Sequence, residues 1–360
     1  MYRKSYIEIR IDHIKHNCRF FLEHSDKKLI GVVKADGYGT IDFMEATALQ
    51  EEGVDFFAVS SLEEALRLRK HNILSDILIL GYVSADDLQI VKENAFHIIT
   101  PDLEYVRNTD LRDVKVHIKL NTGMNRLGIK PHEAKETLEL LLAKKAVIEG
   151  IMSHFSSADT DIEYTKKQYQ EFRNCVTDLD YDFEMIHMSA TDASIILEDD
   201  ICTHHRIGLG LLGYSSYPSD LKPAVSLYSE VTCAKKLNPG DTVSYGRHYC
   251  SDGKGYLLTI PLGYADGFYR SNTNHDVYVE NEHGRIVGSI CMDQMMILTE
   301  HYHAPGAKVE LFGEHVSLEE RAKQLDTISY ELLTSLSDRL ARVHVSEDRI
   351  ISSLTPRFDL

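Results

Sequence analysis

The sequence predicts an α/β protein, in which an N-terminal (β/α)8 barrel of the TIM type is followed by a mostly antiparallel β domain. Two observations support this fold class. Between residues 29 and 210, short apolar runs alternate with longer segments of helical periodicity, which is the pattern of a parallel sheet covered by helices. After Gly213 the chain changes to β-type runs separated by glycine and proline. A chain of 360 residues is long enough to give each part its own core.

Eight apolar runs are the candidate barrel strands. They are Leu29–Val33, Asp55–Val59, Ile77–Leu80, His97–Ile99, Val114–Leu120, Val147–Met152, Phe183–Met188 and a weaker run at His205–Leu209. Between them lie segments such as Leu62–Leu68, with apolar residues at helical spacing behind Ser61 as a helix cap. This number of runs suits a closed barrel better than an open doubly wound sheet, which remains the alternative. A Rossmann domain lacks its signature, because no Gly-x-Gly-x-x-Gly follows the first run.

The expected domain boundary lies in a turn-rich linker, Tyr217–Pro223. We expect the barrel over residues 1–220, with about the first ten residues able to pair with the second domain, and the β domain over residues 221–360. The β-type runs of the second domain are Ala224–Thr232, Tyr256–Ile260, Val277–Val279, Arg285–Ser289 and Met295–Leu298. Two helix-like segments, Ser317–Leu325 and Ile328–Leu340, close it.

Composition and charge exclude several classes of protein. The formal net charge of −17 argues against a nucleic-acid surface, which would need a basic face. No apolar stretch approaches the roughly 18 residues of a membrane span, and the first residues lack the apolar region of a signal peptide. The six cysteines are scattered without a Cys-x-x-Cys pair, so neither structural zinc nor a disulfide framework is expected. The histidines also lack metal-ligand spacing, and we expect a cytoplasmic protein that holds no metal.

Polar residues stand where several of the predicted strands end, which is the end of a barrel that carries chemistry. Lys34 ends the first run, where it is placed to form a Schiff base, and Tyr38 follows four residues later. Lys119 lies at the end of the fifth run, and Arg126 follows in a glycine-containing segment. His154 follows the sixth run, and the glycines of Arg206–Gly210 leave backbone N–H groups free for a phosphate. Taken singly, each pattern is also typical of solvated lysines, structural histidines and plain turns.

Six motifs, in order along both predicted domains, resemble those of alanine racemases. The first is Val33-Lys34-Ala35 with Tyr38-Gly39, and the second is the Asn121–Gly128 loop, Asn-Thr-Gly-Met-Asn-Arg-Leu-Gly. The others are Arg206-Ile207-Gly208, Ser244-Tyr245-Gly246, Gly263–Gly267 and Cys291-Met292-Asp293-Gln294. Because the motifs cover nearly the whole chain, the sequence is identified as a member of this family, whose fold is a barrel followed by a β domain.

The resemblance implies a racemase that uses pyridoxal 5'-phosphate to interconvert L- and D-alanine with two bases. Lys34 would hold the cofactor and act as the base on one face of the substrate. Tyr245 would act on the opposite face, reaching in from a second subunit, so the resemblance implies a homodimer with shared active sites. His154 and Arg206 would help the tyrosine to exchange its proton. Arg206 would also face the pyridine nitrogen of the cofactor and, as a permanent cation, keep it unprotonated, which favours racemisation over transamination.

The resemblance extends to the residues that bind the cofactor and the substrate. Arg126 and the backbone N–H of Met292 would bind the substrate carboxylate. Lys119 matches a lysine that some relatives carbamylate, and Tyr264 and Asp293 match residues at the active-site entrance. The positions that would bind the phosphate are Tyr38, Thr191, Gly208 and Leu209.

Three departures from the family pattern bear on specificity. Ala190-Thr191 stands where Asn-Ser is usual, and Thr40-Ile41 where His-Gly is usual. The C-terminal segment Arg339–His344 ends in histidine where the family has a tyrosine that contacts the phosphate and walls the substrate pocket. A shorter and more polar wall leads to the hypothesis that the pocket admits serine as well as, or better than, alanine.

Other assignments on the same architecture are weaker. Basic-amino-acid decarboxylases look similar at the barrel, but the glycine-rich phosphate loop that they usually carry is not evident here. A non-catalytic pyridoxal-phosphate carrier of the single-barrel kind would leave the second domain, with Tyr245 and Met292, without a purpose. A small amino acid is therefore the expected ligand, with no nucleic acid or membrane partner.

Overall fold

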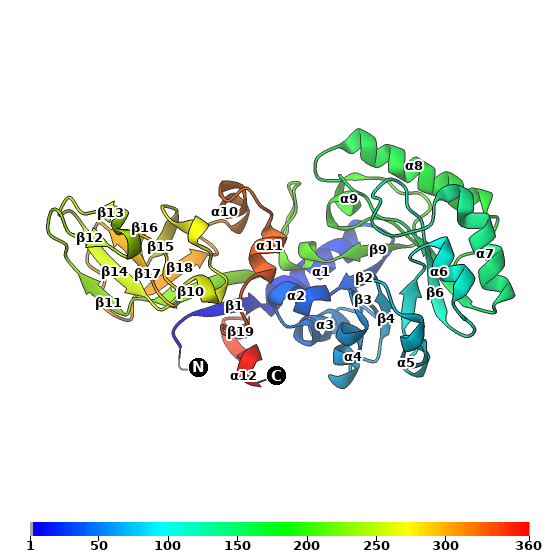
Figure 1. Ribbon diagram of the computed structural model, residues 1–360, viewed down its shortest axis with the longest axis horizontal. Helices are drawn as coiled ribbons and strands as arrows, with labels where there is room; N and C mark the ends of the chain where they lie inside the picture. Colours follow the sequence, from blue (N-terminus) through cyan, green and yellow to red (C-terminus); the bar gives the residue numbers. More distant parts are fainter. Residues whose placement is uncertain (1–2, 360) are drawn as a thin grey trace. The chain divides into compact units, whose positions relative to one another are not determined.

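The computed structural model describes residues 3–359 and divides the chain into two units (Figure 1). One unit is Ile14–Lys222. The other combines the described residues up to His13 with those from Pro223 onward. Within residues 3–359, no helix is long and apolar enough to cross a membrane.

The first unit contains the predicted closed barrel of eight parallel strands, in the order β2-β3-β4-β5-β6-β7-β8-β9. The strands are β2 (Lys28–Val32), β3 (Phe56–Val59), β4 (Asp76–Ile79), β5 (His97–Ile99), β6 (Lys115–Lys119), β7 (Val147–Met152), β8 (Met185–His187) and β9 (His204–Ile207). Each overlaps a predicted run, and β9 pairs with β2 to close the ring, with Ile30 opposite Arg206. Closure excludes the open sheet, and the fold class is confirmed.

Helices cover the barrel, as Figure 1 shows. They are α1 (Ile11–His24), α2 (Lys34–Gly39), α3 (Asp42–Glu51), α4 (Leu62–Lys70), α5 (Leu88–Glu93), α6 (Leu103–Asn108), α7 (Ala134–Ala143), α8 (Ile162–Asp178) and α9 (Thr191–Ile196). Side-chain caps mark several of their starts: the predicted cap Ser61 accepts from the N–H of Glu64 (3.4 Å), and Asp161 caps α8 at Tyr164 (3.0 Å). The short 3-10 helices of this unit are η1 (Ala85–Asp87), η2 (Pro131–Glu133) and η3 (Leu209–Leu212).

The second unit is built on a ten-stranded, mostly antiparallel sheet, in the order β11-β14-β17-β16-β15-β18-β10-β1-β19-β20. Its strands are β1 (Tyr6–Arg10), β10 (Val225–Glu230), β11 (Cys233–Lys235), β14 (Tyr256–Ile260), β15 (Asp276–Val279), β16 (Glu282–Ile286), β17 (Met295–Thr299), β18 (Lys308–Phe312), β19 (Ala341–Ser346) and β20 (Arg349–Leu354). Strand β1 pairs antiparallel with β10 and parallel with β19, so residues 6–10 lie inside this sheet.

Smaller elements complete the second unit. A separate ribbon consists of β12 (Thr242–Val243) and β13 (Tyr249–Cys250), and the helices are α10 (Leu318–Gln324), α11 (Ser329–Thr334), α12 (Pro356–Asp359), η4 (Tyr245–Arg247), η5 (Tyr264–Asp266) and η6 (Arg270–Asn272). The prediction of a helix over Ile328–Leu340 was too long. After α11, the buried guanidinium of Arg342 donates hydrogen bonds to the carbonyl oxygens of Leu336, Ser337 and Leu340. These bonds hold the segment in turns instead of a helix.

Candidate active site

Lys34 follows strand β2 and begins α2 at the C-terminal end of the barrel strands. The next four residues, Ala35–Tyr38, all have φ between 53° and 61°, so the chain makes a left-handed turn directly after the lysine. Glu64 accepts hydrogen bonds from the backbone N–H groups of Ala35 (2.9 Å) and Ser60 (2.7 Å). This carboxylate ties the turn to the end of β3 and so fixes where the amine of Lys34 leaves the backbone.

Arg206 lies buried in β9, and its guanidinium is surrounded by acceptors. Nη1 donates to Nδ1 and to the carbonyl oxygen of His187 (both 2.9 Å). Nη2 donates to the carbonyl oxygens of Ser153 (2.8 Å) and Met188 (2.9 Å) and to Nδ1 of His154 (3.1 Å). Burial lowers the pKa of Arg206 to about 10, and no carboxylate within residues 3–359 pairs with it. The group therefore remains a cation at neutral pH, held only by neutral partners.

Five predicted site residues form one cluster of basic groups: Lys34, Lys119, Arg126, His154 and Arg206. Burial lowers the pKa of the Lys34 amine, and the charges of Arg126 and Arg206 lower it further, against an opposing effect of Glu64. Burial and the same two arginines lower the pKa of Lys119 to about 8. Burial, with Arg206 next in importance, holds the pKa of His154 well below its usual range. The cluster is therefore suited to an anionic ligand.

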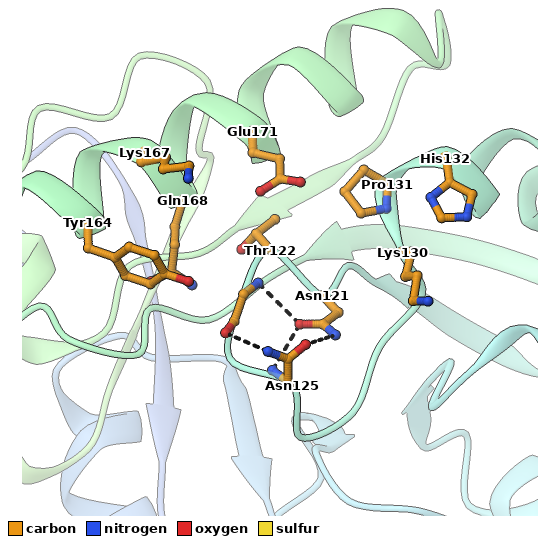
Figure 2. Close-up of a pocket in the computed structure, with 11 residues that line it drawn as sticks. Asn121, Thr122, Asn125, Lys130, Pro131, His132, Tyr164, Lys167, Gln168 and Glu171 are labelled. Atoms are coloured by element: carbon orange, nitrogen blue, oxygen red, sulfur yellow. Dashed lines mark hydrogen bonds between the residues drawn. The ribbon is translucent and has the colours of Figure 1, made fainter.

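Two asparagine amides hold the loop after β6 that carries Arg126 (Figure 2). Oδ1 of Asn121 accepts from the N–H groups of Gly123 (3.2 Å) and Asn125 (3.0 Å), and its Nδ2 donates to Oδ1 of Asn125 (3.0 Å). Nδ2 of Asn125 returns a hydrogen bond to the carbonyl oxygen of Gly123 (3.1 Å). These bonds close the loop just before Arg126, whose side chain is exposed.

A cavity of about 320 Å³ lies against the same loop and α8, as Figure 2 shows. Its lining includes Asn121, Asn125, Tyr164 and Glu171. None of the five residues of the basic cluster lines this cavity. Asn121 and Asn125 of the loop therefore line the cavity, whereas Arg126 of the same loop belongs to the basic cluster.

A second group of predicted residues forms a small cradle at the end of β9. Some of them follow members of the basic cluster closely in the sequence. The side chain of Tyr38 lies against Gly208 so closely that any Cβ at position 208 would collide with the phenol oxygen. The backbone N–H groups of Gly208 and Leu209 donate no hydrogen bond within residues 3–359. Oγ1 of Thr191 accepts from the N–H of Gly210 (3.1 Å), which joins α9 to this turn. Adjacent free N–H groups beside a hydroxyl are a suitable site for a phosphate.

The remaining predicted residues lie on three loops of the second unit. Tyr245 is 75% exposed, and its carbonyl oxygen accepts from Oγ of Ser289 (3.0 Å). The N–H of Tyr264 donates to the carbonyl oxygen of Cys291 (3.1 Å), which brings its loop beside Met292. Met292 is 53% exposed, and its N–H donates no hydrogen bond within the described residues. The structure therefore gathers these side chains on one set of loops and leaves their functional groups accessible.

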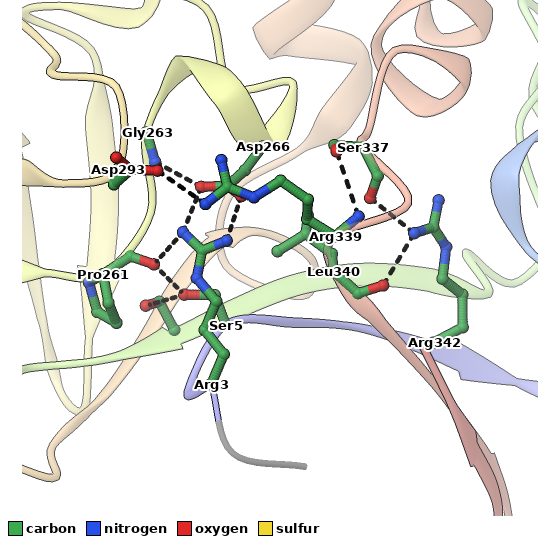
Figure 3. Close-up of polar contacts among 11 residues, drawn as sticks. Arg3, Ser5, Pro261, Gly263, Asp266, Asp293, Ser337, Arg339, Leu340 and Arg342 are labelled. Carbon is green, nitrogen blue, oxygen red and sulfur yellow. Dashed lines mark hydrogen bonds and ion pairs between the residues drawn. The ribbon is translucent and has the colours of Figure 1, made fainter. Parts of the chain in front are cut away.

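An ion-pair network supports those loops (Figure 3). Arg339 pairs with Asp293 (2.7 Å) and lies 3.6 Å from the buried carboxylate of Asp266. Asp266 also pairs with Arg3 and accepts from the N–H of Gly263 (3.0 Å). The predicted residue Asp293 is thus held by Arg339, which also lies near Asp266. The carboxylate of Asp266 in turn shapes the turn that carries Tyr264.

Comparison with known proteins identifies the family. The family model for the alanine racemase N-terminal domain matches residues 9–216, and the model for the alanine racemase C-terminal domain matches residues 224–344. The chain is 34% identical to an alanine racemase of Staphylococcus epidermidis over 366 residues, which cover 95% of each protein. The chain belongs to the alanine racemase family.

Solved structures agree with this assignment. The alanine racemase of Bacillus anthracis with bound L-Ala-P has a TM-score of 0.94 and 30% identity, with complete coverage of both chains. A histidine racemase of Leuconostoc mesenteroides has a TM-score of 0.88 and 27% identity, covering 96% of this chain and 99% of its own. As a member of the alanine racemase family with full-length similarity, the protein is an amino-acid racemase, and thus an isomerase.

Two departures from the alanine racemase pattern now have a structural setting. Thr40, where the family has histidine, donates to the carbonyl oxygen of Gly37 (2.7 Å) and lies 3.3 Å from Oε2 of Glu45. It therefore closes the left-handed turn from within. His344 is buried in β19, with Ile9 of β1 on one side and Ser352 of β20 on the other.

Sequence reasoning missed supporting residues, of which Glu64 and His117 are the clearest. Glu64 carries no motif, because its role depends on a fold contact with Ala35. For His117 a signal was present: in β6, His117 and Lys119 alternate with the apolar residues Val116 and Ile118. Such alternation in a strand buried on both faces indicates a polar layer inside the barrel.

Proposed function

We propose that the protein is a pyridoxal-phosphate-dependent alanine racemase that works by two bases, Lys34 of one subunit and Tyr245 of the partner subunit. The observation that carries this proposal is the basic cluster, which gathers Lys34, Arg126 and Arg206 from strand ends far apart in the sequence. A nucleophilic amine of lowered pKa beside two fixed cations suits an anionic cofactor and a carboxylate substrate.

The residues present fit pyridoxal phosphate. Its phosphate would be held by the free N–H groups of Gly208 and Leu209, the Tyr38 hydroxyl and Thr191, in the cradle where only a glycine at position 208 leaves room for the Tyr38 phenol. Lys34 would carry it and Arg206 would face its ring nitrogen. When bound, the cofactor supplies an electron sink that makes the Cα–H bond of an amino acid acidic. Because its guanidinium stays protonated at neutral pH, Arg206 would limit that sink and would favour return of the proton to Cα.

The two bases divide the faces of the substrate between them. Burial and neighbouring cations lower the pKa of Lys34, so its amine is more readily uncharged and can take or return the Cα proton on one face. Tyr245 is 75% exposed in its own chain, which suits a side chain that completes the site of another subunit. A homodimer with shared active sites follows from this assignment.

His154 is the residue through which Arg206 would act on the partner subunit's Tyr245. Nδ1 of His154 accepts from Arg206, so the ring proton of the neutral histidine resides on Nε2. That N–H is a donor available to a phenolate oxygen. A phenol ordinarily has a pKa near 10, so a tyrosine that acts as a base needs its phenolate form stabilised.

The other residues act on the substrate and at the entrance. Arg126 and the N–H of Met292 would bind the substrate carboxylate, and Tyr264 and Asp293 would line the entrance. Lys119, with a pKa of about 8, is neutral often enough to react with CO2, and we propose it as the lysine that some relatives carbamylate to hold this arginine. We further propose that the enzyme acts in the cytoplasm.

Serine, or a broader range of amino acids, is the second candidate substrate. The observation that favours it is His344, where the family has a tyrosine that walls the pocket. A histidine racemase with the same fold shows that side chains other than methyl are processed on this architecture. The barrel and Lys34 are equally compatible with all of these substrates.

Chiral product analysis tests the proposal. Purified enzyme, with and without added pyridoxal phosphate, is given L-alanine, L-serine or L-histidine in separate reactions. We expect D-alanine to form fastest and to depend on the cofactor; faster formation of D-serine or D-histidine would replace alanine as the substrate. No D-product from enzyme that holds the cofactor would contradict the proposal and direct the search to decarboxylation, by measuring CO2.

A lysine variant supplies the site-specific control. Lys34→Ala should lose racemase activity and the visible absorbance of the lysine-bound cofactor. Lys28→Ala, at the opposite end of the same strand and exposed, should retain both. Normal turnover by Lys34→Ala would refute the assignment.

A further inference from the structure

Three buried histidines, each from a different barrel strand, connect Arg206 to the N-terminal ends of the strands. Nδ1 of His187 lies 2.9 Å from Arg206 Nη1, and Nε2 of His187 lies 2.9 Å from Nδ1 of His117. Nε2 of His117 lies 3.1 Å from Nδ1 of His97, and Nε2 of His97 lies 3.2 Å from Oδ1 of Asp76. All three rings are at most 2% exposed, whereas the Asp76 carboxylate is 49% exposed. We call these three residues the histidine chain.

A glycine makes the chain possible. His117 is in β6 and His187 is in β8, so their contact must pass the intervening strand β7. At the position paired with His117, β7 has Gly150, and a Cβ there would lie 2.7 Å from Nδ1 of His117. That nitrogen is the one that meets His187. Phe56 packs edge-on against both His97 and His117, which keeps the chain away from water.

The guanidinium sets the direction of every hydrogen bond in the chain. Arginine has only donors, so Nδ1 of His187 must accept and its proton must be on Nε2. The same reasoning passes along the chain: His117 and then His97 each accept at Nδ1 and donate from Nε2. The last donor reaches the carboxylate of Asp76. Burial and Arg206 hold the pKa of His187 well below its usual range, which agrees with a neutral ring.

The opposite direction fails at Arg206. Lys115 lies 3.1 Å from Asp76 and 3.2 Å from Nε2 of His97, so it could donate to that ring instead. The chain would then run toward the active site and place an N–H of His187 against an N–H of Arg206. Two donors facing each other in a buried site cost more than a weakened contact between Lys115 and His97 at the exposed end.

We propose that His97, His117 and His187 are positioning residues that orient Arg206 through a polarised hydrogen-bond chain ending at Asp76. The chain gives the buried guanidinium a neutral acceptor, Nδ1 of His187. That imidazole is polarised through His117 and His97 by the carboxylate of Asp76, which lies outside the site. Arg206 is fixed in rotation without an anion beside it, so its charge remains available. Only the role given to Arg206 rests on the proposed function.

The tautomers provide a test that needs no turnover. In enzyme labelled with ¹⁵N in the histidine rings and loaded with pyridoxal phosphate, two-dimensional NMR at pH 7 distinguishes the protonated nitrogen of each ring. Single His→Gln variants assign the signals. We expect a proton on Nε2 and none on Nδ1 for His97, His117 and His187. A proton on Nδ1 of any of the three would overturn the proposal.

Kinetics test the effect on Arg206. His187→Asn keeps an acceptor near the position of Nδ1, whereas His187→Leu removes it. Losing a hydrogen bond to a charged group predicts a fall in kcat of about 10- to 100-fold for leucine, with substantial rescue by asparagine. The absorbance of the bound cofactor should shift in the leucine variant and return in the asparagine variant. Equal kcat in both variants would overturn the proposal.

A matched control comes from the same strand. His205 is also buried in β9 but contacts Asp199 (3.2 Å) instead of Arg206. His205→Leu should lower stability while kcat stays within about twofold of wild type, since no active-site hydrogen bond is lost. If wild-type enzyme racemised no amino acid, the proposed function would fail while the NMR result still decided the histidine chain.

Discussion

Single residues in this barrel include buried charged groups with no direct counterion, and Arg206 is the foremost example. Its acceptors are carbonyl oxygens and neutral imidazoles, so the cost of burying the cation is met by hydrogen bonds rather than by an ion pair. Among the described residues, the guanidinium is thus held by carbonyl oxygens and imidazole nitrogens.

Glu45 is the acidic counterpart, buried under the left-handed turn. One carboxyl oxygen, Oε1, makes no hydrogen bond, and burial raises the pKa of Glu45 well above its usual range, with Asp42 adding to the effect. The folded protein therefore keeps this proton to a higher pH than the unfolded chain. Between the two pKa values the folded state binds more protons, so stability falls as pH rises.

Glu45→Gln should remove that dependence. The variant should match wild type near pH 4 and become more stable than it as pH rises, by about 1.4 kcal/mol per pH unit until the folded pKa is reached. Urea unfolding at a series of pH values measures this difference. Glu51→Gln, at an exposed position of the same helix, should change little; a constant difference for Glu45→Gln across all pH values would contradict the prediction.

Among the elements, α2 departs most from its regular form, because its residues turn left-handed directly after Lys34. Gly37 suits this conformation because glycine adopts its φ of 61° without strain, and a Cβ there would also lie 2.6 Å from Oε2 of Glu45. Ala35 does not, with φ of 53°. The left-handed region costs a residue with a Cβ about 1–2 kcal/mol, which Glu64 helps to offset by binding the Ala35 N–H.

Ala35→Gly should therefore stabilise the protein, although glycine is usually destabilising. Relief of the left-handed strain, less the greater entropy of unfolded glycine, predicts a gain of about 0.5–1 kcal/mol in the free energy of unfolding. Ala46→Gly, in the right-handed helix α3, should instead lose about 1 kcal/mol. Denaturant titration compares the two; a loss in both would show that Ala35 is not strained.

At the scale of the whole molecule, the predicted site residues are divided between the two units of the chain. Lys34, Arg126 and Arg206 belong to the barrel unit, whereas Tyr245 and Met292 lie on exposed loops of the β unit. The proposed two-base chemistry needs both sets at one substrate. Assembly from two subunits satisfies this if each barrel receives the loops of its partner.

Subunit complementation tests that arrangement. Lys34→Ala and Tyr245→Phe homodimers should each be inactive, because every site lacks one base. After exchange of equal amounts, half of the dimers are mixed and each has one complete site, so activity should recover to about one quarter of wild type. Subunit exchange is verified with differently tagged chains. No recovery in exchanged dimers would place both bases in one chain.

Much of the architecture follows from the sequence because each barrel strand can be recognised from the pattern of its own short segment. Each apolar run, such as Val147–Met152, forms a strand from its own pattern, and neighbouring runs pair in chain order. Strand β19 gave no such signal: it contains Arg342 and His344, and its partner β1 comes from the opposite end of the chain. Pairing across that separation depends on the packed sheet, which no local pattern describes.

The sequence by itself determined the fold class, the strand ends that carry Lys34 and Arg206, and the family motifs. These depend on periodicity and residue type, which are properties of short segments. Only the tertiary structure decided which groups meet: the amine with the arginines, Tyr38 with Gly208, and His117 with His187 across Gly150. The reason is physical. Barrel closure brings distant strands within hydrogen-bond distance, and burial in the resulting interior alters pKa values that spacing along the chain leaves unspecified.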